Sequence, residues 1–231
     1  MNDKYNVLEI FSSISGEAQH AGELTTFIRL AGCNLNCSWC DTAKMLKENN
    51  FTVLTTSEIV HQCQLNGHKH VIVTGGEPLI KPNICELIGN LIKAGFEVEI
   101  ETNGSVDFHP IVDRLADLGF TTRYSFTLDY KMPGSGMEDK MNPEVFEHLD
   151  DLNSDDVIKF VVTEDDIEPC MELIEKFQAQ GTLCKYYISP VFGQVELPHI
   201  IEAMKKHHMN EDVKFQLQIH KYVWDPNKTG V

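Results

Sequence analysis

The sequence predicts an α/β fold, in the form of a partial (β/α)6 TIM-like barrel, and two observations support this. First, short apolar segments typical of strands alternate with segments typical of helices along most of the 231 residues. This alternation indicates right-handed βαβ units and a parallel sheet, and six units are too few for a closed eight-stranded barrel. Second, no linker-like or low-complexity stretch divides the chain, so we expect residues 1–231 to form one domain.

The expected strands are apolar runs bounded by polar or glycine-containing turns. They cover residues 7–11, 25–30, 70–74, 96–101, 123–129, 157–162, 184–189 and 213–219. Helices are expected at residues 55–65, 82–94, 110–118, 142–149, 169–180 and from Pro198 onward. Thr55 and Glu58 match a capping box, and Gly67 matches a helix end. Proline opens several helices because the N–H that it lacks has no partner in the first turn. Residues 12–17 are predicted to form a polar loop and residues 44–50 a mobile polar segment.

Composition limits the class of protein. The chain is 42% hydrophobic and carries a formal net charge of −16, and it has no apolar run as long as a membrane helix. An acidic surface repels phosphate groups, so nucleic acid and anionic membranes are not expected as partners. The N-terminal residues do not resemble a signal peptide, so we expect a cytoplasmic protein with reduced thiols.

Three of the seven cysteines lie close together, as Cys33, Cys37 and Cys40, and no fourth cysteine or histidine follows nearby. A structural zinc site normally has four such ligands, whereas three thiolates on a 4Fe–4S cluster leave one iron open to a small molecule. The alternative is three structural or zinc-binding cysteines on a loop. The spacing, with Trp39 just before the last cysteine, resembles the cluster loop of radical S-adenosylmethionine (SAM) enzymes. The other four cysteines lie in apolar segments and are expected to be buried.

The remaining unusual residues gather at one edge of the expected sheet. Each of the following comes after the C-terminal end of an expected strand: the cysteine loop, Gly75-Gly76-Glu77-Pro78, Glu101-Thr102-Asn103-Gly104, Asp129-Tyr130-Lys131 and His220. Barrel enzymes build their active sites at this edge, so we expect a single site there.

The resemblance to radical SAM enzymes implies a SAM site at this edge. Gly76 and Glu77 would hold the methionyl amine, Asp129 the ribose and Lys131 the methionyl carboxylate. On spacing alone, Gly76 and Glu77 are also compatible with an ordinary strand-to-helix turn. Asp129 and Lys131 are likewise compatible with a solvated strand end. The full implied set is Trp39, Cys40, Asp41, Gly76, Glu77, Asp129, Tyr130, Lys131, Ser189, Pro190, Val191 and Phe192.

Two further residues are candidates for substrate binding. Arg29 lies in an expected strand between apolar residues, where its guanidinium needs an anion such as a substrate carboxylate. The alternative is a salt bridge to Glu17 or Glu9. His220 is placed to hydrogen-bond a ligand, although a lone histidine is more often structural.

Nearly the whole chain resembles the 7-carboxy-7-deazaguanine synthases. The resemblance rests on residues 9–17, 27–33, 40–42, 74–78, 101–104 and 218–221. It implies that SAM is cleaved to a 5′-deoxyadenosyl radical, which starts conversion of 6-carboxy-5,6,7,8-tetrahydropterin to 7-carboxy-7-deazaguanine and ammonia. It also implies Mg²⁺ bound by Thr42, a homodimer, and a flavodoxin-type or other low-potential reductant. The implied substrate contacts are Ile14, Ser15, Gly16, Glu17, Arg29, Thr74 and His220.

The chain departs from the family pattern at several positions. Ser15 stands where glutamine is common, Ala18 where glycine is usual, and Asp129-Tyr130 where many members have Ser-Pro. The tail from residue 221 to residue 231 either closes over the pocket or packs outside it.

Two other functions fit part of the pattern. A glycyl-radical-enzyme activase shares the cysteine spacing and the short length, but it acts on a protein glycine. Arg29 and Glu17 in the cavity favour a small acidic substrate instead. A non-catalytic iron–sulfur scaffold or electron carrier has no use for the Gly75-Gly76-Glu77-Pro78 turn or the other residues of the edge.

Overall fold

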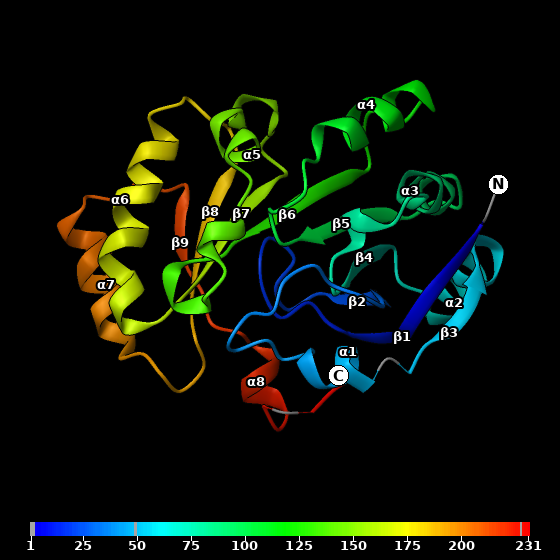
Figure 1. The fold of residues 1–231 in the computed structure, drawn as a ribbon, viewed down its shortest axis with the longest axis horizontal. Coiled ribbons are helices and arrows are strands. Elements are labelled where there is room, and N and C mark those ends of the chain that lie inside the picture. The colour runs from blue at the N-terminus through cyan, green and yellow to red at the C-terminus, as the bar shows by residue number, and fades with distance from the viewer. Residues whose placement is uncertain (1–2, 49, 227) are drawn as a thin grey trace.

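The computed structural model describes residues 3–48, 50–226 and 228–231, and its central feature is a curved sheet (Figure 1). Within these residues the sheet has nine strands in the order β3-β1-β2-β4-β5-β6-β7-β8-β9. The strands are β1 (Lys4–Ile14), β2 (Leu24–Leu30), β3 (Thr52–Thr55), β4 (His70–Gly75), β5 (Glu97–Thr102), β6 (Tyr124–Tyr130), β7 (Val157–Val162), β8 (Lys185–Pro190) and β9 (Val213–Phe215). From β2 to β9 all neighbouring strands are parallel, whereas β1 runs antiparallel to both β2 and β3.

The helices are α1 (Ala43–Glu48), α2 (Thr56–Asn66), α3 (Ile84–Lys93), α4 (His109–Asp117), α5 (Pro143–Glu147), α6 (Ile167–Gln178), α7 (Leu197–Lys206) and α8 (His220–Val223). Of these, α3 to α7 each connect two successive parallel strands. Short 3-10 helices lie at Pro78–Ile80, Pro133–Ser135, Glu138–Lys140, Leu149–Asp151 and Glu164–Asp166. In Figure 1, α6 and α7 lie by the β8–β9 end of the sheet and α2 by the β3–β1 end. The predicted partial barrel is confirmed.

The two faces of the sheet differ in chemistry because side chains alternate along each strand. On the outer face, Val71, Val73, Ile158 and Phe160 belong to one large buried apolar core that the helices complete. Fully burying such a side chain contributes about 1.5–3 kcal/mol. The inner face carries polar side chains at many of the intervening positions, including Lys159. This inner face forms the wall of the site.

Several expected details of the chain are confirmed. Helix α2 begins with the capping box of Thr55 and Glu58, and Gly67 ends it with a φ of 76°. The four cysteines outside the cysteine loop are all buried. No helix in the described part of the chain is long and apolar enough to cross a membrane.

Other expected boundaries are wrong. Strand β1 begins at Lys4 and continues to Ile14, through part of the expected polar loop, because it pairs with β2 on one side and β3 on the other. Helix α1 covers residues 43–48, and so most of the expected mobile segment 44–50, of which residue 49 lies outside the described residues; β3 follows this segment. Its polar side chains are compatible with a surface helix, which polarity alone does not distinguish from a loop.

The last expected strand is also too long. Strand β9 ends at Phe215, and His220 begins the short helix α8 instead of ending a strand. Earlier, α6 begins at Ile167, before Pro169, because Thr163 and Asp166 form a capping box that starts a 3-10 turn. Helix α5 stops at Glu147, two residues before its expected end.

Candidate active site

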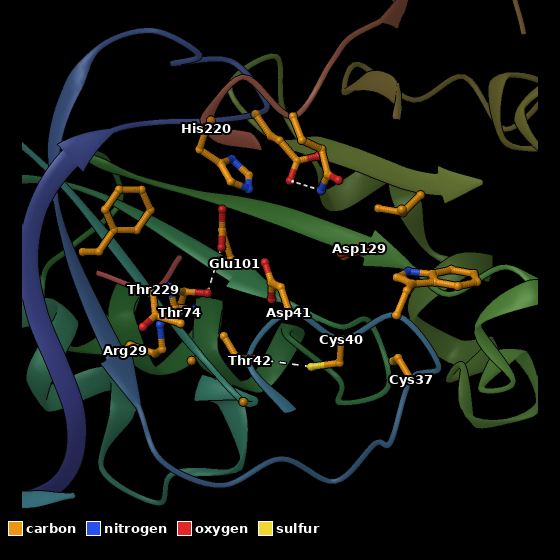
Figure 2. A pocket seen from close by; sticks show the side chains of 18 of the residues that line it. Arg29, Cys37, Cys40, Asp41, Thr42, Thr74, Glu101, Asp129, His220 and Thr229 are labelled. Atoms are coloured by element: carbon orange, nitrogen blue, oxygen red, sulfur yellow. Dashed lines mark hydrogen bonds between the residues drawn. The ribbon is translucent and has the colours of Figure 1, made fainter. Parts of the chain in front are cut away.

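One cavity of about 240 Å³ lies at the C-terminal edge of the parallel strands (Figure 2). The cysteine loop forms part of its wall, together with the end of β1, the inner face of the sheet and the C-terminal tail. Pro226 and residues 228–231 line the cavity. Of the two placements expected for the tail, this agrees with closing over the pocket and not with packing outside it. Residues far apart in the sequence are thus combined in a single site.

The three cysteines of the loop are only half-buried, and all three line the cavity. The loop is anchored from outside, since Ser38 donates its backbone N–H to Ser135 O (3.0 Å) and its hydroxyl to Gly134 O (2.9 Å). The described lining residues include these three cysteines and no fourth one, and His220 is the one histidine among them. This donor set fits a 4Fe–4S cluster with one open iron better than a closed zinc site.

The Gly75-Gly76-Glu77 turn follows β4 and packs against the backbone that leads from β2 into the cysteine loop. A Cβ atom on Gly75 would lie 2.1 Å from Leu30 O, and one on Gly76 would lie 2.0 Å from Gly32 O. Glycine is therefore required at both positions because two backbones pack against each other. Gly76 also lines the cavity, as expected for a residue whose backbone approaches a ligand.

The Glu77 carboxylate is fully buried behind this turn. It accepts hydrogen bonds from Leu79 N (2.9 Å), Thr102 Oγ1 (2.7 Å) and Asn103 N (2.7 Å). Because Glu77 does not line the cavity, its visible role is to hold the ends of β4 and β5 together.

A chain of alternating charges crosses the inner wall. Lys159 Nζ lies 3.4 Å from Glu17 Oε2 and 3.4 Å from Asp129 Oδ2, and Lys131 Nζ lies 2.9 Å from the same Asp129 oxygen. Burial lowers the pKa of both lysines, but the facing carboxylates outweigh it and place both pKa values above the usual range. Both lysines are therefore charged at neutral pH.

Glu17 is the most strongly held acid of this chain of charges. Burial raises its pKa, but Lys159, Gln218, His220 and Ser189 outweigh burial and bring the pKa to about 2. Ser189 Oγ donates to Glu17 Oε1 (2.9 Å) and Gln218 Nε2 donates to Oε2 (3.1 Å). Glu17 thus presents a fixed carboxylate to the cavity.

Two buried oxygens in the wall have no hydrogen-bond partner within the described residues. They are Oδ1 of Asp129 and Oε1 of Gln218, and both side chains line the cavity. A buried acceptor without a partner costs roughly 1–3 kcal/mol, so these atoms are suited to ligand donors.

Arg29 occupies the opposite part of the wall. Its Nε lies 2.8 Å from Glu9 Oε1, and its guanidinium lies 5.7 Å from the centre of the Phe11 ring. The salt bridge to Glu9 that the sequence allowed as an alternative is therefore present. The side chain nevertheless lines the cavity, so the ion pair and ligand binding are compatible.

His220 reaches the cavity from α8 and packs on the end of the β1 segment. A Cβ on Gly16 would lie 2.0 Å from His220 Nδ1, and Ile219 N donates to Gly16 O (3.0 Å). Burial lowers the pKa of His220, although Glu17 and Asp41 act in the opposite direction. The imidazole is therefore neutral at pH 7 and is able both to donate and to accept a hydrogen bond.

On the other side of the site, Thr74 Oγ1 donates to Glu101 Oε2 (2.7 Å), and Cys40 Sγ lies 3.3 Å from Thr42 Oγ1 (Figure 2). The following expected site residues also line the cavity: Ile14, Gly16, Glu17, Arg29, Trp39, Cys40, Asp41, Thr42, Thr74, Gly76, Asp129, Lys131, Val191, Phe192 and His220.

Five expected site residues lie behind the wall instead. Ser15 donates its hydroxyl to Glu17 O (3.0 Å), and Ser189 is occupied by Glu17 as described. The Tyr130 ring packs against Phe146, with ring centres 4.8 Å apart. Pro190 is buried at the end of β8, and Glu77 is buried behind the turn.

Sequence reasoning missed Lys159, the link between Glu17 and Asp129. The signal was present, because Lys159 is the one charged residue in the apolar strand Val157–Val162. A buried lysine in such a strand needs carboxylate partners, and only the fold identifies them.

A three-thiolate loop beside a Gly-Gly-Glu turn, at the C-terminal edge of a partial barrel, defines a protein of the radical SAM superfamily. The family model described as "Radical SAM superfamily" accordingly matches residues 27–130. The chain is 44% identical over 230 residues to 7-carboxy-7-deazaguanine synthase of Clostridium acetobutylicum, covering 98% of this chain and 99% of that protein. The chain therefore belongs to the 7-carboxy-7-deazaguanine synthase family.

Other comparisons agree with this assignment. The synthase of Methanospirillum hungatei is 38% identical over 222 residues, covering 95% of this chain and 86% of that protein. The crystal structure of QueE from Escherichia coli superposes with a TM-score of 0.66 at 22% identity, covering 92% of this chain and 94% of that chain. This structural likeness shows the fold, and membership of the family implies a 4Fe–4S cluster and SAM as cofactors.

Proposed function

We propose that this protein is a 7-carboxy-7-deazaguanine synthase. It converts 6-carboxy-5,6,7,8-tetrahydropterin to 7-carboxy-7-deazaguanine and ammonia, by radical ring contraction, on the route to queuosine and related 7-deazapurines. The observation that supports this most is that one cavity combines the three-cysteine loop with a fixed carboxylate and an arginine. This combination suits a small, acidic, nitrogen-rich substrate.

The cofactors are held at the cysteine side of the cavity. Cys33, Cys37 and Cys40 are the cluster ligands. The bound cluster and SAM would supply the radical chemistry needed for hydrogen abstraction. The Lys131 ammonium binds the methionyl carboxylate of SAM, and the unpartnered Asp129 Oδ1 accepts a hydrogen bond from its ribose.

The substrate is held at the opposite side. Arg29 binds the pterin carboxylate, because a guanidinium presents several donors to a carboxylate. The ionised Glu17 accepts hydrogen bonds from pterin N–H groups, and Gln218 Oε1 accepts a further hydrogen bond from the pterin. Neutral His220 and the Thr74 hydroxyl complete the contacts. The tail over the cavity excludes water from the reacting atoms.

Mg²⁺ is proposed at Thr42, whose hydroxyl lines the cavity next to Cys40. A site with one hydroxyl ligand suits Mg²⁺ that keeps several waters and also takes substrate oxygens. We further propose that residues 1–231 form a single domain, and that the protein is a cytoplasmic homodimer supplied with electrons by a flavodoxin-type or similar low-potential reductant.

The proposed function is tested anaerobically with the reconstituted protein, SAM, dithionite, Mg²⁺ and 6-carboxytetrahydropterin. We expect 7-carboxy-7-deazaguanine to accumulate without stoichiometric loss of SAM. Arg29→Ala is expected to raise KM for the pterin by about 100-fold, the loss of a charged hydrogen bond of roughly 3 kcal/mol, while SAM binding is unchanged. Cleavage of SAM with the pterin left intact would contradict the substrate assignment and point to a different radical SAM reaction.

A further inference from the structure

A second group of metal-binding side chains lies at the other end of the barrel from the cysteines. His70 is the first residue of β4, Glu99 is the third residue of β5, and His20 belongs to the loop between β1 and β2. One ligand atom of each of the three lies within 4.8 Å of the other two. We propose that His20, His70 and Glu99 bind a divalent transition metal, for which Zn²⁺ is the appropriate probe.

The distances inside this group suit a metal site. His70 Nε2 lies 3.6 Å from Glu99 Oε2, slightly too far for a hydrogen bond. Two ligands of a tetrahedral zinc with bonds of about 2.0–2.1 Å lie about 3.4 Å apart. A small movement of these side chains is therefore sufficient for both to coordinate one ion.

Glu99 provides an independent indication of a ligand. Its side chain is 2% exposed, and its Oε2 atom has no hydrogen-bond partner among the described residues. The other oxygen, Oε1, accepts a hydrogen bond from Thr127 Oγ1 (2.7 Å), which fixes the carboxylate plane. The buried oxygen that faces the two imidazoles is thus the one that lacks a partner.

The Nδ1 nitrogen of each imidazole already has a polar partner within the protein. His70 Nδ1 lies 3.3 Å from Thr25 Oγ1, and His20 Nδ1 lies 3.2 Å from Glu23 Oε2. Metal-binding histidines are usually oriented in this way, with one ring nitrogen on a carboxylate or another oxygen and the other on the metal. The remaining ligand atoms are then the two Nε2 nitrogens.

The chemistry of the donor atoms suits a transition metal, because the group combines two imidazoles with one carboxylate oxygen. Imidazole with carboxylate is a donor set that zinc and its neighbours in the first transition row bind well. The His20 side chain is 32% exposed, which gives the ion access and leaves room for a water as fourth ligand.

Such a metal would have a structural role for the active site. The loop that carries His20 also carries Glu17, whose carboxylate faces the cavity. An ion on His20 ties this loop to β4 and β5 and so limits the movement of Glu17. This site is separate from the cysteine loop and from the Mg²⁺ proposed at Thr42.

The test uses the full chain with Cys33, Cys37 and Cys40 changed to alanine, so that zinc has no cluster thiolates to bind. Isothermal titration with Zn²⁺ is expected to give one site per chain, and Co²⁺ is expected to give visible absorption typical of nitrogen and oxygen ligands. H20A should weaken zinc binding by about 100-fold or more. E23Q, which removes an outer partner, should weaken it by about 10–100-fold.

The matched control is H61A, which removes an exposed histidine of α2 and should leave zinc binding unchanged. His20 is on a surface loop, so its variant is expected to fold even if a Glu99 variant does not. The proposal is overturned if the unsubstituted site binds no zinc, or if H20A binds zinc as tightly as H61A does. Neither result bears on the synthase reaction, because the site lies outside the catalytic cavity.

Discussion

Replacing Lys159 with methionine should remove a large part of the stability of the inner wall. The Lys159 side chain is 9% exposed, and its ammonium lies between the carboxylates of Glu17 and Asp129, 3.4 Å from each. Removing one partner of a buried ion pair costs about 3–5 kcal/mol, because the other charge stays buried and unpaired. We expect K159M to lower the free energy of unfolding by about 3 kcal/mol at pH 7.

The pH dependence identifies the cause of this loss. The pKa of Glu17 is about 2 in the folded chain and 4.5 ordinarily. At about 1.4 kcal/mol per unit, this gap corresponds to roughly 3 kcal/mol of stability. Because the folded pKa is lowered, this contribution is complete above pH 4.5 and is lost as the pH falls toward 2. The difference in stability between K159M and the original chain should therefore shrink over this range.

Urea unfolding of the metal-free chain at pH 7, 4 and 3 measures this difference. Lys4→Met is the control, since Lys4 is an exposed lysine at the start of β1 and its loss should change stability by less than about 0.5 kcal/mol. A difference for K159M below 1 kcal/mol at pH 7, or one that does not change with pH, would refute the ion-pair argument.

Three further predictions concern single residues of the loops. A18G should stabilise the fold by about 1 kcal/mol in urea unfolding, because Ala18 has a φ of 59°, where glycine carries no penalty; an unchanged or lower midpoint would contradict this. G76A should abolish iron incorporation on reconstitution, since its Cβ would lie 2.0 Å from Gly32 O, and normal iron content would disprove the packing argument. T42A should lose the dependence of the rate on Mg²⁺ and T42S should retain it; T42A that still responds to Mg²⁺ would exclude Thr42 as the ligand.

Much of the barrel could be predicted from the sequence because local patterns determine it. Apolar runs of strand length alternate with proline-opened helices, and a parallel arrangement follows from that order. The N-terminal part was harder, since β1 extends to Ile14 through pairing with β2 and β3, which are distant in the chain. Pairing between distant segments overrides the local polarity of Ser12 and Ser13.

The site could be predicted best where its residues follow the ends of strands; within strands, Arg29 was found and Lys159 was missed. Asp129 and Arg29 were found because charged residues stand out at a strand end or among apolar neighbours. Ser15 and Tyr130 were assigned by their position in a motif, but only the structure shows that their side chains turn away from the cavity. His220 reaches the cavity from a helix and not from the expected strand.

The charges of the cavity explain how so acidic a chain can bind carboxylates. The net charge of −16 repels anions at long range, but cationic side chains line the cavity, among them Arg29, Lys131 and Lys159. Each of these three is oriented by a carboxylate of the protein, at distances of 2.8–3.4 Å. A cation held in place in this way loses little conformational entropy when a ligand binds. The wall is therefore preorganised for anionic groups, and K159M should weaken SAM and substrate binding along with stability, because Asp129 and Glu17 lose their common partner.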